Sequence, residues 1–293
     1  MKLLKTPEDR FSDLPGYPYS PEYVELDGLA MHYVDEGEGD PVLLLHGEPT
    51  WSYLYRKMIP IISGKARAVA PDFIGFGKSD KLPNMEDYTY ELHRDSLFAF
   101  IEILDLENIT LVCQDWGGLV GLRVATMMPE RFARLVIMNT GLPLGNNPPE
   151  AFLKWRGFVE KNEDLPVGFI LQGATVTELP PEVVAAYEAP FPSGEYKAGA
   201  RAWPLMVPIS PDDEVVPEMK LARDGLSEWK KPCLVMFSDK DPITKGGDGF
   251  FRKLVPTAND QPEIIIKDGG HFLQEDKGEE IAGHILDFIE RTA

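Results

Sequence analysis

Apolar and polar positions alternate along this chain in two rhythms, one with the period of β-strands and one with the period of α-helices. Residues 23–34 alternate across a turn at Asp27-Gly28, which predicts an antiparallel hairpin. Short, continuous apolar runs follow, as expected for strands that are covered on both faces. We expect such buried strands at 41–45, 66–71 and 109–114, and further strands of the same sheet at 134–138, 233–237 and 263–266.

Helical patterns occupy the stretches between these strands. We expect helices at 51–62, 88–105, 119–128 and 279–291. Strands that alternate with helices imply a parallel, doubly wound sheet. The alternation stops after Thr140, and 143–226 is rich in proline, glycine and aromatic residues, without a clear buried strand. We therefore predict an α/β core made of 1–142 and 227–293, with an inserted helical cap at 143–226.

Composition and charge exclude several classes of function. The formal net charge of −19 argues against binding to nucleic acid or to anionic membranes, which both need a basic surface. No run approaches the roughly 20 apolar residues needed to span a bilayer, and the N-terminus lacks the apolar stretch of a secretory signal. Cys113 and Cys233 lie in apolar runs, and the five histidines show no metal-ligand spacing. We expect a soluble, cytoplasmic, monomeric enzyme that uses no metal and no cofactor.

The most informative residue is Asp115, which follows the run 109–114 and precedes Trp116 and a glycine pair. A buried strand, a sharp turn and a helix start are typical of a nucleophile elbow, which lifts one side chain above the sheet. The usual glycine two positions before the nucleophile is replaced here by Cys113. A carboxylate that attacks a saturated carbon leaves an ester that water can hydrolyse, whereas serine would leave a stable ether. The alternative is that Asp115 caps the following helix.

His271 and Asp241 are candidates for the partners of Asp115. His271 lies in a glycine-rich loop after the run 263–266, where open α/β sheets gather their active residues. Imidazole suits the role of general base at neutral pH. Both Asp239 and Asp241 follow the strand 233–237, and we favour Asp241 because Asp239 is nearer the strand end and better placed to cap a turn. The order Asp115, Asp241, His271 matches the order of a hydrolase triad.

Trp116 and Glu48 are the candidates for stabilising the negative charge that develops on the leaving group or on the oxyanion. The indole of Trp116 is a donor-only N–H on an apolar body, suited to a soft anion such as chloride or bromide, although simple packing is an alternative. Glu48 follows the first core strand, in the loop that normally supplies a backbone N–H to the oxyanion hole. Its acidic side chain is compatible with positioning water or bonding to a halide-binding indole.

These motifs together resemble those of the haloalkane dehalogenases. The resemblance rests on His46-Gly-Glu-Pro-Thr-Trp51, Cys113-Gln-Asp-Trp-Gly-Gly118, Ser238-Asp-Lys-Asp241 and Gly270-His-Phe272, and it extends over essentially the whole chain. It implies Asp115 as nucleophile, His271 as base, Asp241 as acid, Trp116 as a halide ligand and Glu48 as a helper. It also implies a second halide-binding tryptophan from the cap. The matching position is Trp155, with Trp203 in reserve.

The resemblance implies a small-molecule haloalkane as substrate, with water as the second reactant and halide as a product. An epoxide hydrolase is the main alternative, because it uses the same Asp–His–Asp triad. It also needs two cap tyrosines as acids, and Tyr187 and Tyr196 are available. The acidic Glu48 and the position of Trp155 weigh against it. A fluoroacetate dehalogenase is disfavoured because the elbow lacks arginines to bind a carboxylate. A non-catalytic receptor would not need the complete triad.

Overall fold

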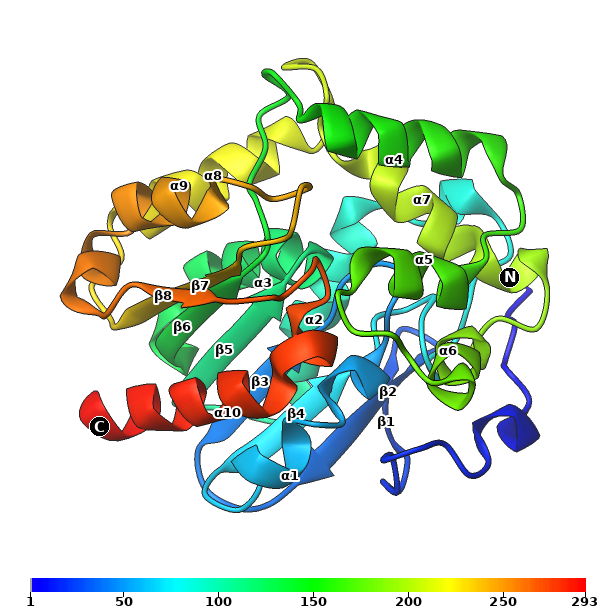
Figure 1. The fold of residues 1–293 in the computed structure, drawn as a ribbon, viewed down its shortest axis with the longest axis horizontal. Helices are drawn as coiled ribbons and strands as arrows, with labels where there is room; N and C mark the ends of the chain where they lie inside the picture. The colour runs from blue at the N-terminus through cyan, green and yellow to red at the C-terminus, as the bar shows by residue number, and fades with distance from the viewer. Residues whose placement is uncertain (1) are drawn as a thin grey trace.

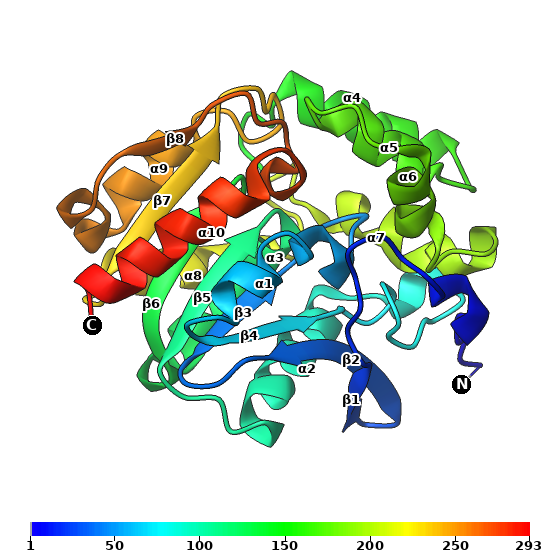
Figure 2. The ribbon, with the colours of Figure 1, turned by 60° about the horizontal axis from the view of Figure 1, so that its bottom comes forward.

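A single eight-stranded sheet runs through the molecule, in the order β1-β2-β4-β3-β5-β6-β7-β8. The computed structural model describes residues 2–293, and Figures 1 and 2 show the sheet from two sides. Only β2 runs against the others, because it pairs antiparallel with both of its neighbours. The strands are β1 Glu22–Leu26, β2 Leu29–Glu36, β3 Pro41–Leu45, β4 Arg67–Pro71, β5 Ile109–Gln114, β6 Phe132–Met138, β7 Cys233–Ser238 and β8 Ile264–Ile266.

Two layers of helices cover the sheet, which explains why its central strands are apolar throughout. Helices α1 and α10 pack together on one face, and α2, α3, α8 and α9 pack on the other. All residues of β3 and β5 are buried as a result. The helices that pack on the sheet are α1 Ile59–Ile62, α2 Tyr90–Ile103, α3 Trp116–Met127, α8 Val216–Ser227, α9 Gly247–Leu254 and α10 Leu273–Arg291.

Between β6 and β7 the chain inserts a helical segment above the carboxyl ends of the parallel strands, at the upper right of Figure 1. This segment contains no strand among its described residues. Its helices above the sheet are α4 Glu150–Lys161, α5 Val167–Ala174, α6 Pro181–Glu188 and α7 Ala198–Met206, and α8 then returns the chain to the face of the sheet that α3 covers. The fold is therefore an α/β-hydrolase fold with an inserted helical cap, as the sequence predicts.

The hairpin and the strands agree with the sequence pattern, although β8 at the edge of the sheet is only partly buried, with Ile265 exposed. Two predicted helices differ. Residues 51–62 do not form one helix. They form a short 3-10 turn, Ser52–Tyr55, and then α1, because Pro60 has no N–H and its ring would clash with a preceding helical carbonyl. The terminal helix begins at Leu273 rather than near 279 and contains a kink at Lys277. Within residues 2–293, no helix is both long and apolar enough to cross a bilayer.

Candidate active site

Asp115 occupies a strained turn between β5 and α3. Its φ of 50° and ψ of −126° are rare for a residue with a side chain, and its carboxylate makes no capping bond to α3. The capping alternative is thus wrong. The backbone around Asp115 is held by Thr140, whose Oγ1 donates to the Asp115 carbonyl at 2.6 Å. A Cβ on Gly47 would lie only 2.3 Å from the Asp115 Cβ, so the neighbouring loop can approach this closely only without a side chain.

His271 lies between two carboxylates, in the loop between β8 and α10. Its Nδ1 is 3.0 Å from Oδ2 of Asp241, and its Nε2 is 3.5 Å from Oδ2 of Asp115. The three side chains follow β5, β7 and β8, whose parallel carboxyl ends meet at one edge of the sheet. Asp239 instead accepts the backbone N–H of Asp268 at 2.8 Å. The structure therefore brings Asp241, and not Asp239, to the histidine.

Two amides that sequence reasoning did not single out also hold His271. The side-chain amide nitrogens of Gln114 and Asn139 lie 3.2 and 3.1 Å from the His271 carbonyl. The Gln114 nitrogen is also 3.1 Å from Nε2 of the ring. Asn139 joins the loops after β6, β7 and β8, because it also donates to Ser238 and to the Gly270 carbonyl. The sequence signals that could have identified them are the position of Gln114 directly before the predicted elbow and that of Asn139 at the end of a predicted strand.

The charges around His271 set its protonation. Burial by itself lowers the pKa of His271, but the charges and hydrogen bonds of Asp241 and Asp115 outweigh burial and raise that pKa to about 10. Burial likewise opposes ionisation of Asp241, but His271 and the donors of Thr244 and Ile243 lower its pKa. The resting site therefore holds a protonated imidazole between two carboxylates at neutral pH.

Glu48 contributes its backbone N–H and a buried carboxyl group. The N–H donates to Oδ1 of Asp115 at 2.8 Å, as an oxyanion-hole donor would. The Glu48 side chain is 5% exposed, and its Oε1 has no hydrogen-bond partner among the described residues. Burial, and then the nearby charge of Asp115, raise the pKa of Glu48 well above its ordinary value. The Glu48 carboxyl group therefore keeps its proton to a higher pH than an ordinary glutamate does.

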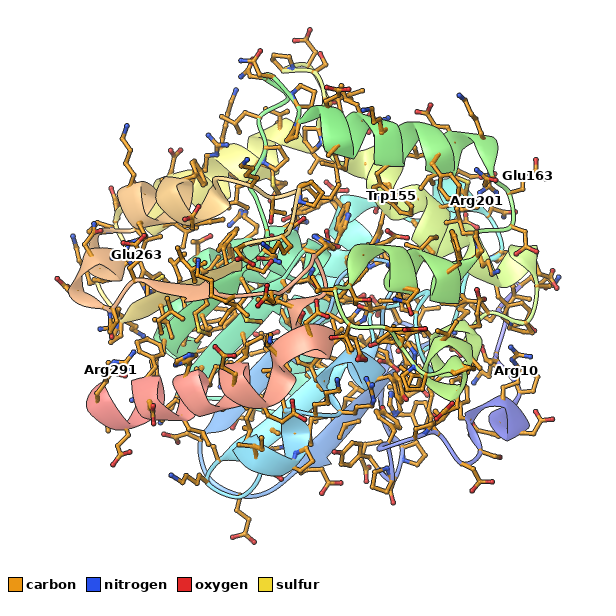
Figure 3. All side chains as sticks on the ribbon, viewed as in Figure 1. Arg10, Trp155, Glu163, Arg201, Glu263 and Arg291 are labelled. Atoms are coloured by element: carbon orange, nitrogen blue, oxygen red, sulfur yellow. The ribbon has the colours of Figure 1, made fainter. Side chains whose placement is uncertain are left out.

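An apolar cavity of about 290 Å³ lies above Asp115, between the core and α4 and α5. Trp116 and Trp155 both line it, together with Glu48 and His271. Trp116 comes from the elbow, and Trp155 projects from the inner side of α4, where Figure 3 labels it. Five sequence-predicted residues therefore share one cavity, and Asp241 lies behind His271, outside the cavity wall. The few polar groups of the cavity face an otherwise hydrophobic wall.

Three other aromatic candidates do not line this cavity. Trp203 is fully buried, and its indole N–H donates to Nε2 of His93 at 2.6 Å, so it has no N–H left for a halide. Tyr187 donates its hydroxyl to Glu275 at 2.8 Å, and Tyr196 lies elsewhere in the cap. The two tyrosines are thus not placed to protonate an epoxide above Asp115. Within residues 2–293, no cluster of His, Cys, Asp or Glu side chains could hold a metal ion.

Comparison with known proteins agrees with this geometry. Residues 40–175 match the model of the alpha/beta hydrolase fold family. The chain is 48% identical to the haloalkane dehalogenase of Psychrobacter cryohalolentis, over 99% of this chain and 98% of that protein. It is also 48% identical to haloalkane dehalogenase 1 of Mycobacterium tuberculosis, over 100% of both chains.

A solved structure gives the same result in three dimensions. The tetrameric haloalkane dehalogenase DpaA of Paraglaciecola agarilytica superposes with a TM-score of 0.91 at 41% identity, over 97% of each chain. The aligned region includes both the core and the inserted cap, because it covers 97% of this chain. The chain therefore belongs to the haloalkane dehalogenases, a family of the α/β-hydrolase fold.

Proposed function

We propose that Asp115, His271 and Asp241 cleave the carbon–halogen bond of a haloalkane through a covalent ester on Asp115. As a haloalkane dehalogenase, the protein is a hydrolase that acts on carbon–halide bonds. The observation that carries the assignment is a carboxylate on the elbow, with a backbone donor 2.8 Å from one oxygen and an imidazole 3.5 Å from the other. An alternative epoxide hydrolase is not favoured, since the cap tyrosines are engaged or placed elsewhere.

In the first half-reaction, Oδ2 of Asp115 attacks the halogen-bearing carbon in line with the leaving halide. Oδ1 is already bound by the Glu48 N–H, which leaves Oδ2, 3.5 Å from Nε2 of His271, as the attacking oxygen. The new carbon–oxygen bond gives an alkyl ester, and the electron pair of the carbon–halogen bond leaves with the halide. The indole N–H groups of Trp116 and Trp155 bind that halide as its charge develops.

In the second half-reaction, water attacks the carboxyl carbon of the ester. Esterification removes the negative charge of Asp115, so the pKa of His271 falls and the imidazole releases its proton. Neutral His271, held by Asp241, then takes the proton of the attacking water. The N–H groups of Glu48 and Trp116 stabilise the tetrahedral oxyanion, and losing one such donor typically costs about 3–4 kcal/mol. Alcohol leaves, and Asp115 is regenerated.

Trapping the ester tests this scheme directly. The His271→Ala variant lacks the base for the second step but retains the nucleophile of the first. Incubation with 1,2-dibromoethane should release about one bromide per enzyme in a burst, and mass spectrometry should find the bromoethyl adduct on the peptide containing Asp115. Asp115→Asn is the matched control and should give neither burst nor adduct.

A failure to detect the adduct, while the wild-type enzyme turns over the same substrate, would refute the covalent route. A single turnover in H₂¹⁸O gives an independent reading, because the scheme places the label in the Asp115 carboxylate first. Styrene oxide assayed beside 1,2-dibromoethane separates halide release from epoxide opening.

We further propose that 1–142 and 227–293 form the core domain and 143–226 the cap domain, with α8 packed against α3 of the core. All proposed site residues come from one chain, which supports a monomer as the working unit, although DpaA is a tetramer. Light scattering of the purified protein tests this. We place the enzyme in the cytoplasm and assign it a detoxifying role, because conversion of an alkyl halide to an alcohol removes an alkylating agent.

A further inference from the structure

A second cavity, which we call the side chamber, opens onto Asp115 from another direction. It encloses about 420 Å³ and shares Asp115, Phe152, Val207 and Ile243 with the main cavity. From there it extends between the segment 140–149, which leads into the cap, and the loop 243–247 before α9. A substrate bound at Asp115 therefore has a second compartment into which a long tail can reach.

Two cations without acidic partners lie in the wall of the side chamber. Arg223 and Lys245 line it, and Asp115 is the sole acidic residue of that wall. Neither cation forms a salt bridge within residues 2–293. The whole chain has 48 acidic and 29 basic residues. A compartment with two positive charges and one catalytic carboxylate is therefore more basic than the chain as a whole.

Arg223 is fixed in position by its neighbours. Its Nε donates to the Leu142 carbonyl at 2.7 Å, and Nη2 contacts the same oxygen. The guanidinium carbon lies 4.7 Å from the centroid of the Phe250 ring, which also lines the chamber. Burial lowers the pKa of Arg223, but a guanidinium remains charged at any physiological pH. Among residues 2–293, Nη1 of Arg223 has no hydrogen-bond acceptor, so this fixed guanidinium offers a donor to a ligand.

The start of α9 adds to the positive potential of the same wall. Gly246, the N-cap of this helix, and Gly247, its first residue, line the chamber. The N–H of Gly247 donates to the Thr244 carbonyl at 2.9 Å, so this helix start contributes the positive end of its dipole, which favours an anion nearby. The remaining wall near Asp115 is apolar, with Leu119, Pro149 and Phe152 suited to contact a methylene chain.

We propose that the side chamber is an anion subsite that binds the carboxylate of an ω-halocarboxylate, while the halogenated end of the same molecule reaches Asp115. This rests on the proposed function of Asp115. The reaction would convert an ω-halocarboxylate and water to an ω-hydroxycarboxylate, halide and a proton. The carboxylate stays at the far end of the chain, away from the negative nucleophile. This distinguishes the site from one for α-halo acids.

Charge reversal at Lys245 tests the subsite without touching the reacting atoms. Lys245 is exposed at the rim, so Lys245→Glu should fold normally. Substrates would be ω-bromoalkanoates of four to eight carbons, paired with the ω-bromoalkan-1-ols of the same length. We expect the wild type to favour one chain length of acid, and Lys245→Glu to lower the acid-to-alcohol ratio of kcat/KM by about tenfold, with a smaller fall in Lys245→Gln.

Lys65→Glu is the matched control. Lys65 is exposed and precedes the amino end of β4, whereas the site lies at the carboxyl ends of the parallel strands. Lys65→Glu changes the net charge by the same amount as Lys245→Glu. It should leave the ratio unchanged. Added salt should reduce the acid preference of the wild type and have little effect on Lys245→Gln.

Two results would overturn the subsite. One is an acid-to-alcohol ratio that is the same in the wild type and Lys245→Glu at every chain length. The other is a fall of kcat with unchanged kcat/KM for acids and alcohols alike, which would instead make the chamber an exit route for halide. An absence of bromide release from the alcohols in the wild type would count against the proposed function itself and not against the subsite.

Discussion

The indole of Trp203 stacks on the indole of Trp116, with ring centroids 4.8 Å apart and an angle of 22° between the planes. Trp203 belongs to α7 of the cap, and its N–H donates to Nε2 of His93 on α2. Trp203 also stacks on His46, whose loop carries the Glu48 N–H, at a centroid distance of 6.2 Å. The cap therefore contacts both the proposed halide ligand and the oxyanion loop through one buried side chain.

Replacement of Trp203 by phenylalanine should weaken halide binding without removing a halide ligand. Phenylalanine keeps an aromatic face but loses the bond to His93, so Trp116 should be held less firmly. We expect the inhibition constant of product bromide to rise about three- to tenfold, because a hydrogen bond of this kind contributes about 1 kcal/mol. Initial rates at increasing bromide concentration measure this. Trp229→Phe, a buried tryptophan outside the cavity, is the control, and equal inhibition constants in both variants would contradict the idea.

Stability in acid should depend on His93. Burial, and then the neighbouring His46, lower the pKa of His93 to about 3, so its native form is neutral and can accept the Trp203 N–H. The unfolded chain binds a proton on this histidine below about pH 6.5, but the native state does not. A lowered histidine pKa therefore contributes stability above pH 6.5 that is lost as the pH falls.

We expect the free energy of unfolding to fall between pH 6.5 and 4, with His93 contributing at most about 1.4 kcal/mol per pH unit. The His93→Gln variant can still accept the Trp203 N–H but does not titrate, so its slope should be smaller. Urea denaturation at several pH values measures both slopes. Parallel slopes in the two proteins would show that His93 does not carry this dependence.

Asparagine at position 115 should change the titration of His271. The neutral amide removes one of the two negative charges that raise the His271 pKa, as the proposed alkyl ester would during turnover. The imidazole of Asp115→Asn should therefore titrate at a lower pH than that of the wild type. Nitrogen-15 NMR of the histidine side chains follows this directly, with His284 on the exposed face of α10 as an internal reference. An unchanged titration would remove the basis for proton release upon esterification.

A carboxyl group at position 48 should impose a decline of activity at high pH. The pKa of Glu48 is raised by burial and by Asp115, so the side chain loses its proton only as the pH rises through this raised pKa. Ionisation would place a second negative charge beside the nucleophile and oppose the departure of halide. The fall of kcat/KM at alkaline pH should therefore be absent in Glu48→Gln and present in Glu48→Asp. Identical profiles for wild type and Glu48→Gln would exclude Glu48 as the titrating group.

Several features of the protein were accessible from the sequence alone, because each has a local physical cause. The continuous apolar runs mark strands that are covered on both faces, and the alternation around Asp27-Gly28 marks the hairpin. The meeting of Asp115, Asp241 and His271 could be inferred from the sequence, because each residue follows a parallel strand and the carboxyl ends of parallel strands lie at one end of the sheet. The prediction of one helix at 51–62 did not take account of Pro60, which disfavours a continuous helix through that position.

Other features were decided by contacts between residues far apart in the chain. Whether Trp155 or Trp203 reaches the cavity depends on how α4 and α7 pack over the core, and the bond between Trp203 and His93 joins positions 110 residues apart. The roles of Gln114 and Asn139 around His271 likewise depend on loops that meet only in the folded chain. The sequence determined which chemical groups stand after which strands, since backbone periodicity and turn chemistry are local. The tertiary structure decided their burial, partners and protonation, because these depend on what the rest of the chain places around them.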